Sequence, residues 1–234
     1  MPVVFGLLII AAYLFGSIPV AYLVARWSHG IDIRQYGSGN VGSTNVVAST
    51  SKLVATPVII FDLGKGALMV GVAHLLGLGI IAEVTVGLAT IIGHNWSVFL
   101  RFGGGRGLLT TVGVAFILPS INSLAPWAII AALAIVAIVL VIAHSMPLGA
   151  GAGTLALPLI SWGLGEPLPI VLGYVLVLLI VVAKRTAVPR TAIAASLSYK
   201  QLFVNRLLFD RDIRDRKVWL NRQSAKHSEG QKKD

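Results

Sequence analysis

The sequence has no cysteine and very little charge. The absence of cysteine excludes disulfides, zinc sites built on thiolates and any mechanism through a cysteine thioester. Only 12% of the 234 residues are charged and 56% are hydrophobic, whereas a soluble domain has about 25% charged and about 45–50% apolar residues. The composition therefore excludes a water-soluble domain. It indicates an integral membrane protein with room for one helical bundle and no separate soluble domain.

Positive charge is concentrated near the C-terminus. The formal net charge is +10, and the segment 184–234 holds thirteen Lys and Arg against five Asp and Glu. After a membrane bundle, such a tail marks the cytoplasmic side and the anionic lipid headgroups there, so nucleic-acid binding is disfavoured. The prediction is a bundle over 1–184 and a basic cytoplasmic tail over 185–234.

The hydrophobic runs predict an all-α integral membrane protein with about seven transmembrane helices. The N-terminus is expected outside and the C-terminus in the cytoplasm, because the basic loops 26–52 and 93–107 and the tail must share one side. The short run 108–118 is expected to tilt or to begin in a re-entrant loop. The predicted spans are about 1–25, 53–77, 79–93, 108–118, 125–144, 148–163 and 168–183.

The tail contains one further predicted helix. Apolar residues at Tyr199, Leu202, Phe203 and Leu207 have helical spacing with basic and polar residues between them. This pattern predicts a basic amphipathic helix in the membrane interface. The residues from Lys226 onward are expected to be disordered.

The first cytoplasmic loop is rich in glycine. Gly37, Gly39 and Gly42 have the G-x-G-x-x-G spacing of dinucleotide-binding folds, but no strand precedes them and no acidic residue follows until Asp62, so that fold is excluded. Three glycines still allow successive N–H groups to point at an anion. The alternative is a turn that caps the next helix. The neutral donors of the loop are Ser38, Asn40, Ser43, Thr44 and Asn45.

A second glycine-rich loop lies on the same predicted side, at 93–107. Its Arg106 can bind a phosphate through two N–H groups; alternatively, Arg106 and His94 are ordinary interfacial residues. Two such loops favour binding of two phosphates or two phosphorylated substrates. We therefore expect Gly39 and Arg106 to face one pocket.

Two ionisable residues lie inside the second predicted span. Asp62 and Lys65 are three residues apart on one helix face in an otherwise apolar segment. Ionisable residues within a span are costly, and they are usually paired or functional. Both a functional pair and a mutually neutralising structural pair fit the pattern.

Four short motifs occur in order between residues 16 and 107. They are Gly-Ser-Ile-Pro at 16–19, Gly-Ser-Gly-Asn-Val-Gly-Ser-Thr-Asn at 37–45, Asp-Leu-Gly-Lys-Gly at 62–66, and Gly-His at 93–94 with Gly-Gly-Arg-Gly at 104–107. In these motifs the chain resembles the acyl-phosphate-dependent glycerol-3-phosphate acyltransferase family of bacteria, the PlsY type. The resemblance covers the first half of the chain and becomes weak beyond residue 107.

The resemblance implies a seven-helix bundle in the bacterial cell membrane with its active face in the cytoplasm. It implies transfer of an acyl group from acyl phosphate to the 1-hydroxyl of sn-glycerol 3-phosphate, which gives lysophosphatidate and phosphate without a metal or cofactor. Catalysis is then positioning and electrostatics. The implied catalytic residues are Ser38, Asn40 and Thr44, and the implied substrate-binding residues are Gly37, Gly39, Gly42, Asn45, Lys65, His94, Gly104, Gly105 and Arg106.

The chain departs from the family pattern where positive charge is expected. Ala48 and Gly103 stand at positions where members usually have a cation, and Lys200 and Phe203 stand at those of a His-x-x-Asn pair. Either other basic residues compensate, or the substrate differs, or the chain is a non-catalytic relative that binds lipid precursors or a membrane partner. A small transporter is disfavoured by the uncharged run 107–165. The basic residues available to compensate are Lys52, Lys184, Arg185 and Arg190.

Overall fold

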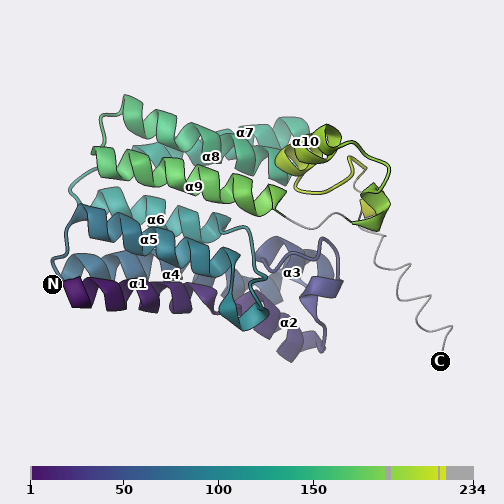
Figure 1. Cartoon of the computed structure of the whole chain (residues 1–234), viewed down its shortest axis with the longest axis horizontal. Coiled ribbons are helices and arrows are strands. Elements are labelled where there is room, and N and C mark those ends of the chain that lie inside the picture. Colours follow the sequence, from purple (N-terminus) through teal and green to yellow (C-terminus); the bar gives the residue numbers. More distant parts are fainter. Residues whose placement is uncertain (1, 188–190, 216, 220–234) are drawn as a thin grey trace.

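The computed structural model describes residues 2–187, 191–215 and 217–219, and every extended regular element in these ranges is a helix (Figure 1). The all-α prediction is confirmed, and each of the seven predicted spans coincides with a helix or, for the first, with α1 and α2. The predicted disorder from Lys226 onward lies outside the described residues. The α-helices are α1 (Pro2–Ser17), α2 (Val20–His29), α3 (Ser43–Ser49), α4 (Lys52–Leu75), α5 (Ile80–Asn95), α6 (Leu108–Ile121), α7 (Trp127–Ala143), α8 (Met146–Gly163), α9 (Leu168–Thr186) and α10 (Tyr199–Phe209).

The long helices run side by side, with α5 near the centre (Figure 1). Helix α5 packs against α1, α4, α6 and α9, while α7 packs on α8 and α8 on α9. The short helices α2, α3 and α10 gather at one end, opposite the N-terminus of α1 (Figure 1). Both glycine-rich loops therefore lie at the end where the tail helix α10 docks.

The outer surface of the bundle is apolar. Leu7 and Ile10 of α1 and Val141 and Ile142 of α7 are each more than half exposed, a surface that suits lipid rather than water. By length and hydropathy, three helical segments are able to cross a bilayer: Pro2–His29, Lys52–Leu75 and Leu168–Thr186. Three shorter apolar helices, α5, α6 and α7, accompany them.

A break between α1 and α2 makes two backbone carbonyl groups available near the site. Pro19 interrupts the helix because it has no N–H to donate, and the N–H of Val20 bonds to Ile18 instead of to Gly16. The carbonyl groups of Gly16 and Ser17 are therefore released from the helical ladder and are free to accept hydrogen bonds from other elements. Glycine at 16 is required because a Cβ there would overlap the backbone of Thr90 on α5.

The predicted tail helix is present as α10. Its first turn is closed by a capping box in which Ser198 and Gln201 exchange hydrogen bonds, a feature that fixes the start of a helix. Its buried residues are Leu202 and Arg206, and it packs against α8 and α9. The tail helix is thus attached to the bundle, and its position at a membrane surface stays a prediction.

Candidate active site

The buried polar centre of the site is the side chain of Lys65. Its ammonium group donates to Asp62 Oδ1 at 2.7 Å, to the released carbonyl of Gly16 at 3.1 Å, and lies 2.7 Å from His94 Nδ1. The Lys65 side chain is completely buried and that of Asp62 is 4% exposed. An ammonium has three N–H donors, so these three acceptors satisfy all of them. The two charges thus neutralise each other, and all three donors of Lys65 are used inside the helical bundle.

This arrangement assigns the tautomer of His94. His94 Nδ1 lies 2.7 Å from the ammonium of Lys65, which carries only donors, and 3.4 Å from Asp62 Oδ1. From the shorter contact we assign Nδ1 as an acceptor and place the proton of the neutral ring on Nε2. Nε2 points at Gly105: a Cβ at that position would overlap the ring nitrogen. His94 therefore presents an N–H donor to the second glycine-rich loop.

The second loop folds back over the end of α5. The N–H of Gly105 donates to the carbonyl of His94 at 3.1 Å, and Ser97 and Gly103 form an isolated bridge across the turn. The hydroxyl of Ser97 donates to the other released carbonyl, that of Ser17, at 2.6 Å. Gly104 has no room for a side chain because a Cβ would meet the carbonyls of His94 and Asn95. Close approach of backbone to backbone explains the glycines here.

The first loop is held together by Asn45. Its Oδ1 accepts from the N–H of Ser38, and its Nδ2 lies 3.0 Å from the carbonyls of Ile33, Tyr36 and Asn40. The side chain is buried, and its groups are used within the loop. Asn45 therefore stabilises the loop conformation, in which Gly37 and Gly39 have left-handed φ angles of 53° and 75°.

The neutral donors of this loop are at the surface. Ser38 and Thr44 are exposed, and Asn40 is half-buried with its N–H near Ser38 Oγ at 3.3 Å. Gly42 is the N-cap of α3 and Ser43 begins that helix. These groups surround the outer face of the loop, from which a ligand could approach.

The two loops touch each other above His94. A Cβ at Gly105 would lie 2.7 Å from the carbonyl oxygen of Val41 in the first loop. A cavity of about 10 Å³ between them, large enough for one water molecule, lies at this junction. It is lined by Ser17, Ile18, Pro19, Val20, Ala21, Val41, Asp62, His94, Ser97, Leu100, Gly104 and Gly105. Gly39 and Arg106 are at the same end of the bundle but do not line this cavity.

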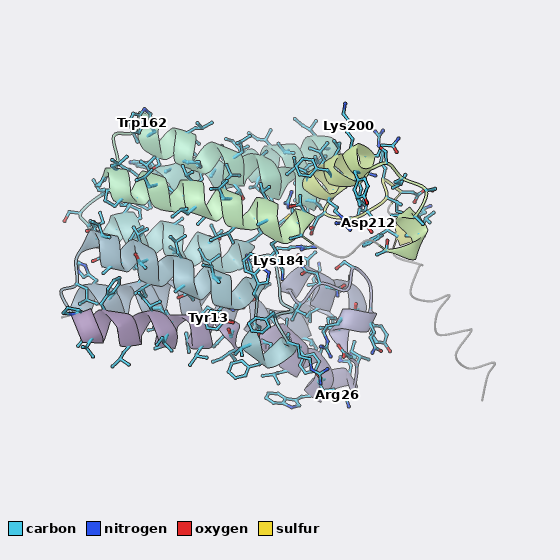
Figure 2. The ribbon with its side chains drawn as sticks, viewed as in Figure 1. Tyr13, Arg26, Trp162, Lys184, Lys200 and Asp212 are labelled. Carbon is cyan, nitrogen blue, oxygen red and sulfur yellow. The ribbon has the colours of Figure 1, made fainter. Side chains whose placement is uncertain are left out.

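Arg106 contacts the tail. Its Nε donates to Asp210 Oδ2 at 2.9 Å, its Nη2 lies 2.8 Å from Asp210 Oδ1, and its Nη1 donates to the carbonyl of Lys184 at 2.9 Å. Lys184, labelled in Figure 2, reaches back from the end of α9 to donate to the carbonyl of Asn95. The second loop is therefore joined to α9 and to the segment after α10.

The structure places the predicted site residues in three neighbouring sets. Lys65, His94, Gly104 and Gly105 come together around the buried cluster, and Arg106 lies beside α9 and the tail. The first-loop residues Gly37 to Asn45 meet the second loop at Val41. Sequence reasoning missed Ser97 and Asp210. The motif Gly16-Ser17-Ile18-Pro19 was the available signal for Ser97, whereas nothing local indicates that Asp210 reaches Arg106.

Among the described residues, no group of three or more His, Asp and Glu side chains is arranged to hold a metal ion. Outside the helices of the bundle, the carboxyl of Asp212 accepts hydrogen bonds from Thr191 and Arg206. Burial alone would raise its pKa, but hydrogen bonds from Arg206 and from the side chain and backbone of Thr191 outweigh burial and hold the pKa below its usual value.

The fold and the site define a class: an α-helical membrane protein with a polar, glycine-lined and cation-rich site at one end of its bundle. The family model described as glycerol-3-phosphate acyltransferase matches residues 6–193. The chain belongs to the glycerol-3-phosphate acyltransferase family, and it is a membrane acyltransferase of phospholipid synthesis.

Individual relatives support the assignment over most of the chain. Glycerol-3-phosphate acyltransferase 5 of Dehalococcoides mccartyi is 44% identical over 231 residues, with 96% of each chain covered. A glycerol-3-phosphate acyltransferase of Thermus thermophilus is 40% identical over 160 residues, which cover 68% of this chain and 77% of that one. The crystal structure of PlsY (YgiH), an integral membrane glycerol 3-phosphate acyltransferase, in its glycerol 3-phosphate form has a TM-score of 0.73 at 26% identity, covering 90% of this chain and 95% of that chain.

Proposed function

We propose that this acyltransferase uses acyl phosphate as its donor and the 1-hydroxyl of sn-glycerol 3-phosphate as its acceptor. The hydroxyl oxygen attacks the acyl carbonyl carbon, the bond from that carbon to the phosphate oxygen breaks, and the leaving phosphate takes the hydroxyl proton. The products are 1-acylglycerol 3-phosphate and inorganic phosphate. The donor is already activated, so the protein has only to position both substrates and stabilise charge.

The observation that carries this proposal is the contact between the two glycine-rich loops above His94. Each loop offers groups that suit a phosphate: neutral hydroxyl, amide and backbone donors in the first, and a guanidinium in the second. The backbones of Val41 and Gly105 lie close together, which supports binding of the two reacting partners on adjacent loops.

Each loop then has a defined part in the reaction. Ser38, Asn40 and Thr44, with the backbone of Gly37, Gly39 and Gly42, bind acyl phosphate, while Arg106 binds the second phosphate. The N–H on His94 Nε2 is a donor for the oxygen that becomes negative in the transition state. Lys65 and Asp62 hold the His94 ring in that orientation and do not contact substrate, so Lys65 acts through His94 rather than by direct charge balance. Asn45 maintains the loop.

We also infer the arrangement in the bacterial cell membrane. The consecutive helices α1 and α2 together, and the six helices α4 to α9, are proposed as seven crossings, with the N-terminus outside and the site in the cytoplasm. The distribution of Lys and Arg supports this orientation. The chain has no cysteine, so single cysteines are clean probes: in intact cells an impermeant maleimide should label Ser120→Cys and not Ser196→Cys, and the reverse pattern would invert the orientation.

The reaction is tested by phosphate release from purified protein given palmitoyl phosphate, with and without sn-glycerol 3-phosphate, and by mass spectrometry for the acylated product. Acceptor-dependent release with lysophosphatidate is expected. The Asn40→Ala variant should lose most of this release while retaining the helical content of the wild type. An enzyme that forms product only from a thioester donor would refute the choice of acyl phosphate, and a folded protein with no turnover would indicate a non-catalytic relative.

A further inference from the structure

Three cations and one carboxylate lie together where the second loop meets α9 and the tail. Arg106 pairs with Asp210 as described above, and Lys184 and Arg185 follow one another at the end of α9. Lys184 and Arg185 both interact electrostatically with Arg106 and with Asp210. The cluster therefore carries two positive charges in excess.

The partners of Lys184 and Arg185 are neutral. Lys184 donates to the carbonyl of Asn95, and its ammonium lies 5.2 Å from the centre of the Trp96 ring. Arg185 is 5% exposed and donates to the carbonyls of Leu207 at 2.6 Å and Pro147 at 3.0 Å. Carbonyl groups and a ring satisfy donors and orient the side chains, but they do not cancel charge.

Cations held away from water without a counter-ion are costly. A phosphate monoester carries about −1.5 to −2 charges at neutral pH and accepts several charge-assisted hydrogen bonds. Its charge therefore matches the excess at this cluster.

We propose that Lys184, supported by Arg185, supplies the positive charge for a substrate phosphate beside Arg106, and that Asp210 is the anion this phosphate displaces. The inference rests on the proposed function, because it names further residues of the same site. The bound group is a phosphate monoester, from either sn-glycerol 3-phosphate or the acyl phosphate.

Asp210 contacts Arg106 through two oxygens, as a bound phosphate would. Its two carboxylate oxygens contact Nε and Nη2 of Arg106, and the same edge of a guanidinium binds a phosphate through two N–H groups. It follows α10 as its C-cap, with a left-handed φ of 56°. Because α10 is attached through Arg206 to Asp212 and to the carbonyl of Thr186, the helix can stay docked while Asp210 releases Arg106.

The test is equilibrium binding by calorimetry to the detergent-purified full chain, with sn-glycerol 3-phosphate in one arm and micellar palmitoyl phosphate in the other. Lys184→Gln should weaken binding of one of them by about tenfold or more, the loss expected for one charge-assisted hydrogen bond. Lys184→Arg should restore part of that loss. The exposed Lys217→Gln is the matched control and should bind like the wild type. The arm that changes identifies the substrate whose phosphate is bound.

Asp210→Asn should change the substrate affinity in the opposite direction. Removal of the competing carboxylate should tighten binding of the same substrate several-fold, whereas a merely structural contact predicts weaker binding for both Asp210→Asn and Lys184→Gln. Unchanged binding of both substrates by Lys184→Gln would overturn the proposal, as would a wild type that binds neither. If the wild type binds a substrate but does not transfer the acyl group from palmitoyl phosphate, the proposed reaction is wrong. The binding measurements on the Lys184 and Asp210 variants still test the phosphate site.

Discussion

The two ends of the bundle bury polar side chains in different ways. At the end that carries the N-terminus of α1, the buried groups are the carboxylates of Glu83 and Glu166. At the other end, Asp62 and Asp212 are buried with the cations that they contact. Buried Arg185 and half-buried Lys184 lie there beside the Arg106–Asp210 pair. Figure 2 shows both ends, with Trp162 at the first and Lys184 at the second.

The carboxylates have local partners. Glu83 Oε2 accepts from Asn122 at 2.7 Å, and its Oε1 lies 2.8 Å from His74 Nδ1. Glu166 accepts from Ser161 at 2.7 Å. Burial raises the pKa of Glu166, while the hydrogen bond from Ser161 opposes that rise, so the cost of burial is moderated near the helix ends. Groups paired in this way stabilise connections between helices.

The opposite end differs in the sign and in the grouping of its charges. The Asp62–Lys65 pair is neutral by itself, but the cluster around Arg106 keeps an excess of positive charge. A balanced buried polar pair is therefore by itself a mark of structure. An unbalanced cluster of one sign, next to exposed donors and close backbone contacts, is a mark of a binding site for the opposite charge.

The largest effect is expected from Lys65→Met. The substitution leaves the Asp62 carboxylate buried without its counter-ion, a change that costs about 3–5 kcal/mol, and it removes the donor that orients His94. Thermal unfolding in detergent should shift strongly downward, and acyl transfer should be lost. Leu68→Met, exposed on the same helix, is the control.

The double variant Asp62→Asn/Lys65→Met separates stability from function. Without either charge, much of the stability should return, but activity should not, because the ring of His94 is no longer fixed. A double variant with normal kcat would show that the cluster is only structural, like the far end of the bundle.

Gly105→Ala should reduce kcat by about tenfold or more with little change in helical content. Its Cβ would overlap His94 Nε2 and crowd the Val41 carbonyl, and a displacement of about 1 Å at a reacting centre costs about 100-fold in rate. Gly64→Ala, where an added Cβ meets nothing within 4 Å, should behave as the wild type. Equal activity of the two variants would show that His94 is not part of the active site.

Glu83→Gln tests the far end. It weakens the hydrogen bonds to Asn122 and His74 and should lower the free energy of unfolding by about 1 kcal/mol. The KM for either substrate should not change, because the group lies at the other end of the bundle. A tenfold change in KM, measured by phosphate release, would contradict the functional division between the two ends.

The smallest effect concerns pH. The pKa of Asp212 is lowered in the folded protein from its usual value of 3.8, so its contribution to docking of the tail is complete above about pH 4–5 and is lost as the pH falls through the lowered value. Limited proteolysis of the tail should therefore accelerate only in strong acid. Asp212→Asn should accelerate it at neutral pH, and a half-maximal effect near pH 6 would implicate a different group.

The sequence determined the class and the main elements of this protein. Low charge and long uninterrupted apolar runs favour a helical membrane bundle, because in lipid a helix satisfies all its backbone groups within one segment. The glycines at 37, 39, 104 and 105 and the Asp62–Lys65 spacing are local features, and each predicts part of the candidate site. Even the tail helix follows from local spacing and the Ser198–Gln201 cap.

Only the tertiary structure decided which groups meet. The role of Lys65 depends on Gly16 and His94, which lie 49 and 29 residues away, and that of Arg106 on Asp210, 104 residues away. A residue type fixes what a side chain can donate or accept, but its partners depend on how the helices pack. For the same reason Asn45, which reads as a ligand in the sequence, is a support for its loop, and the cations at the end of α9 become neighbours of Arg106.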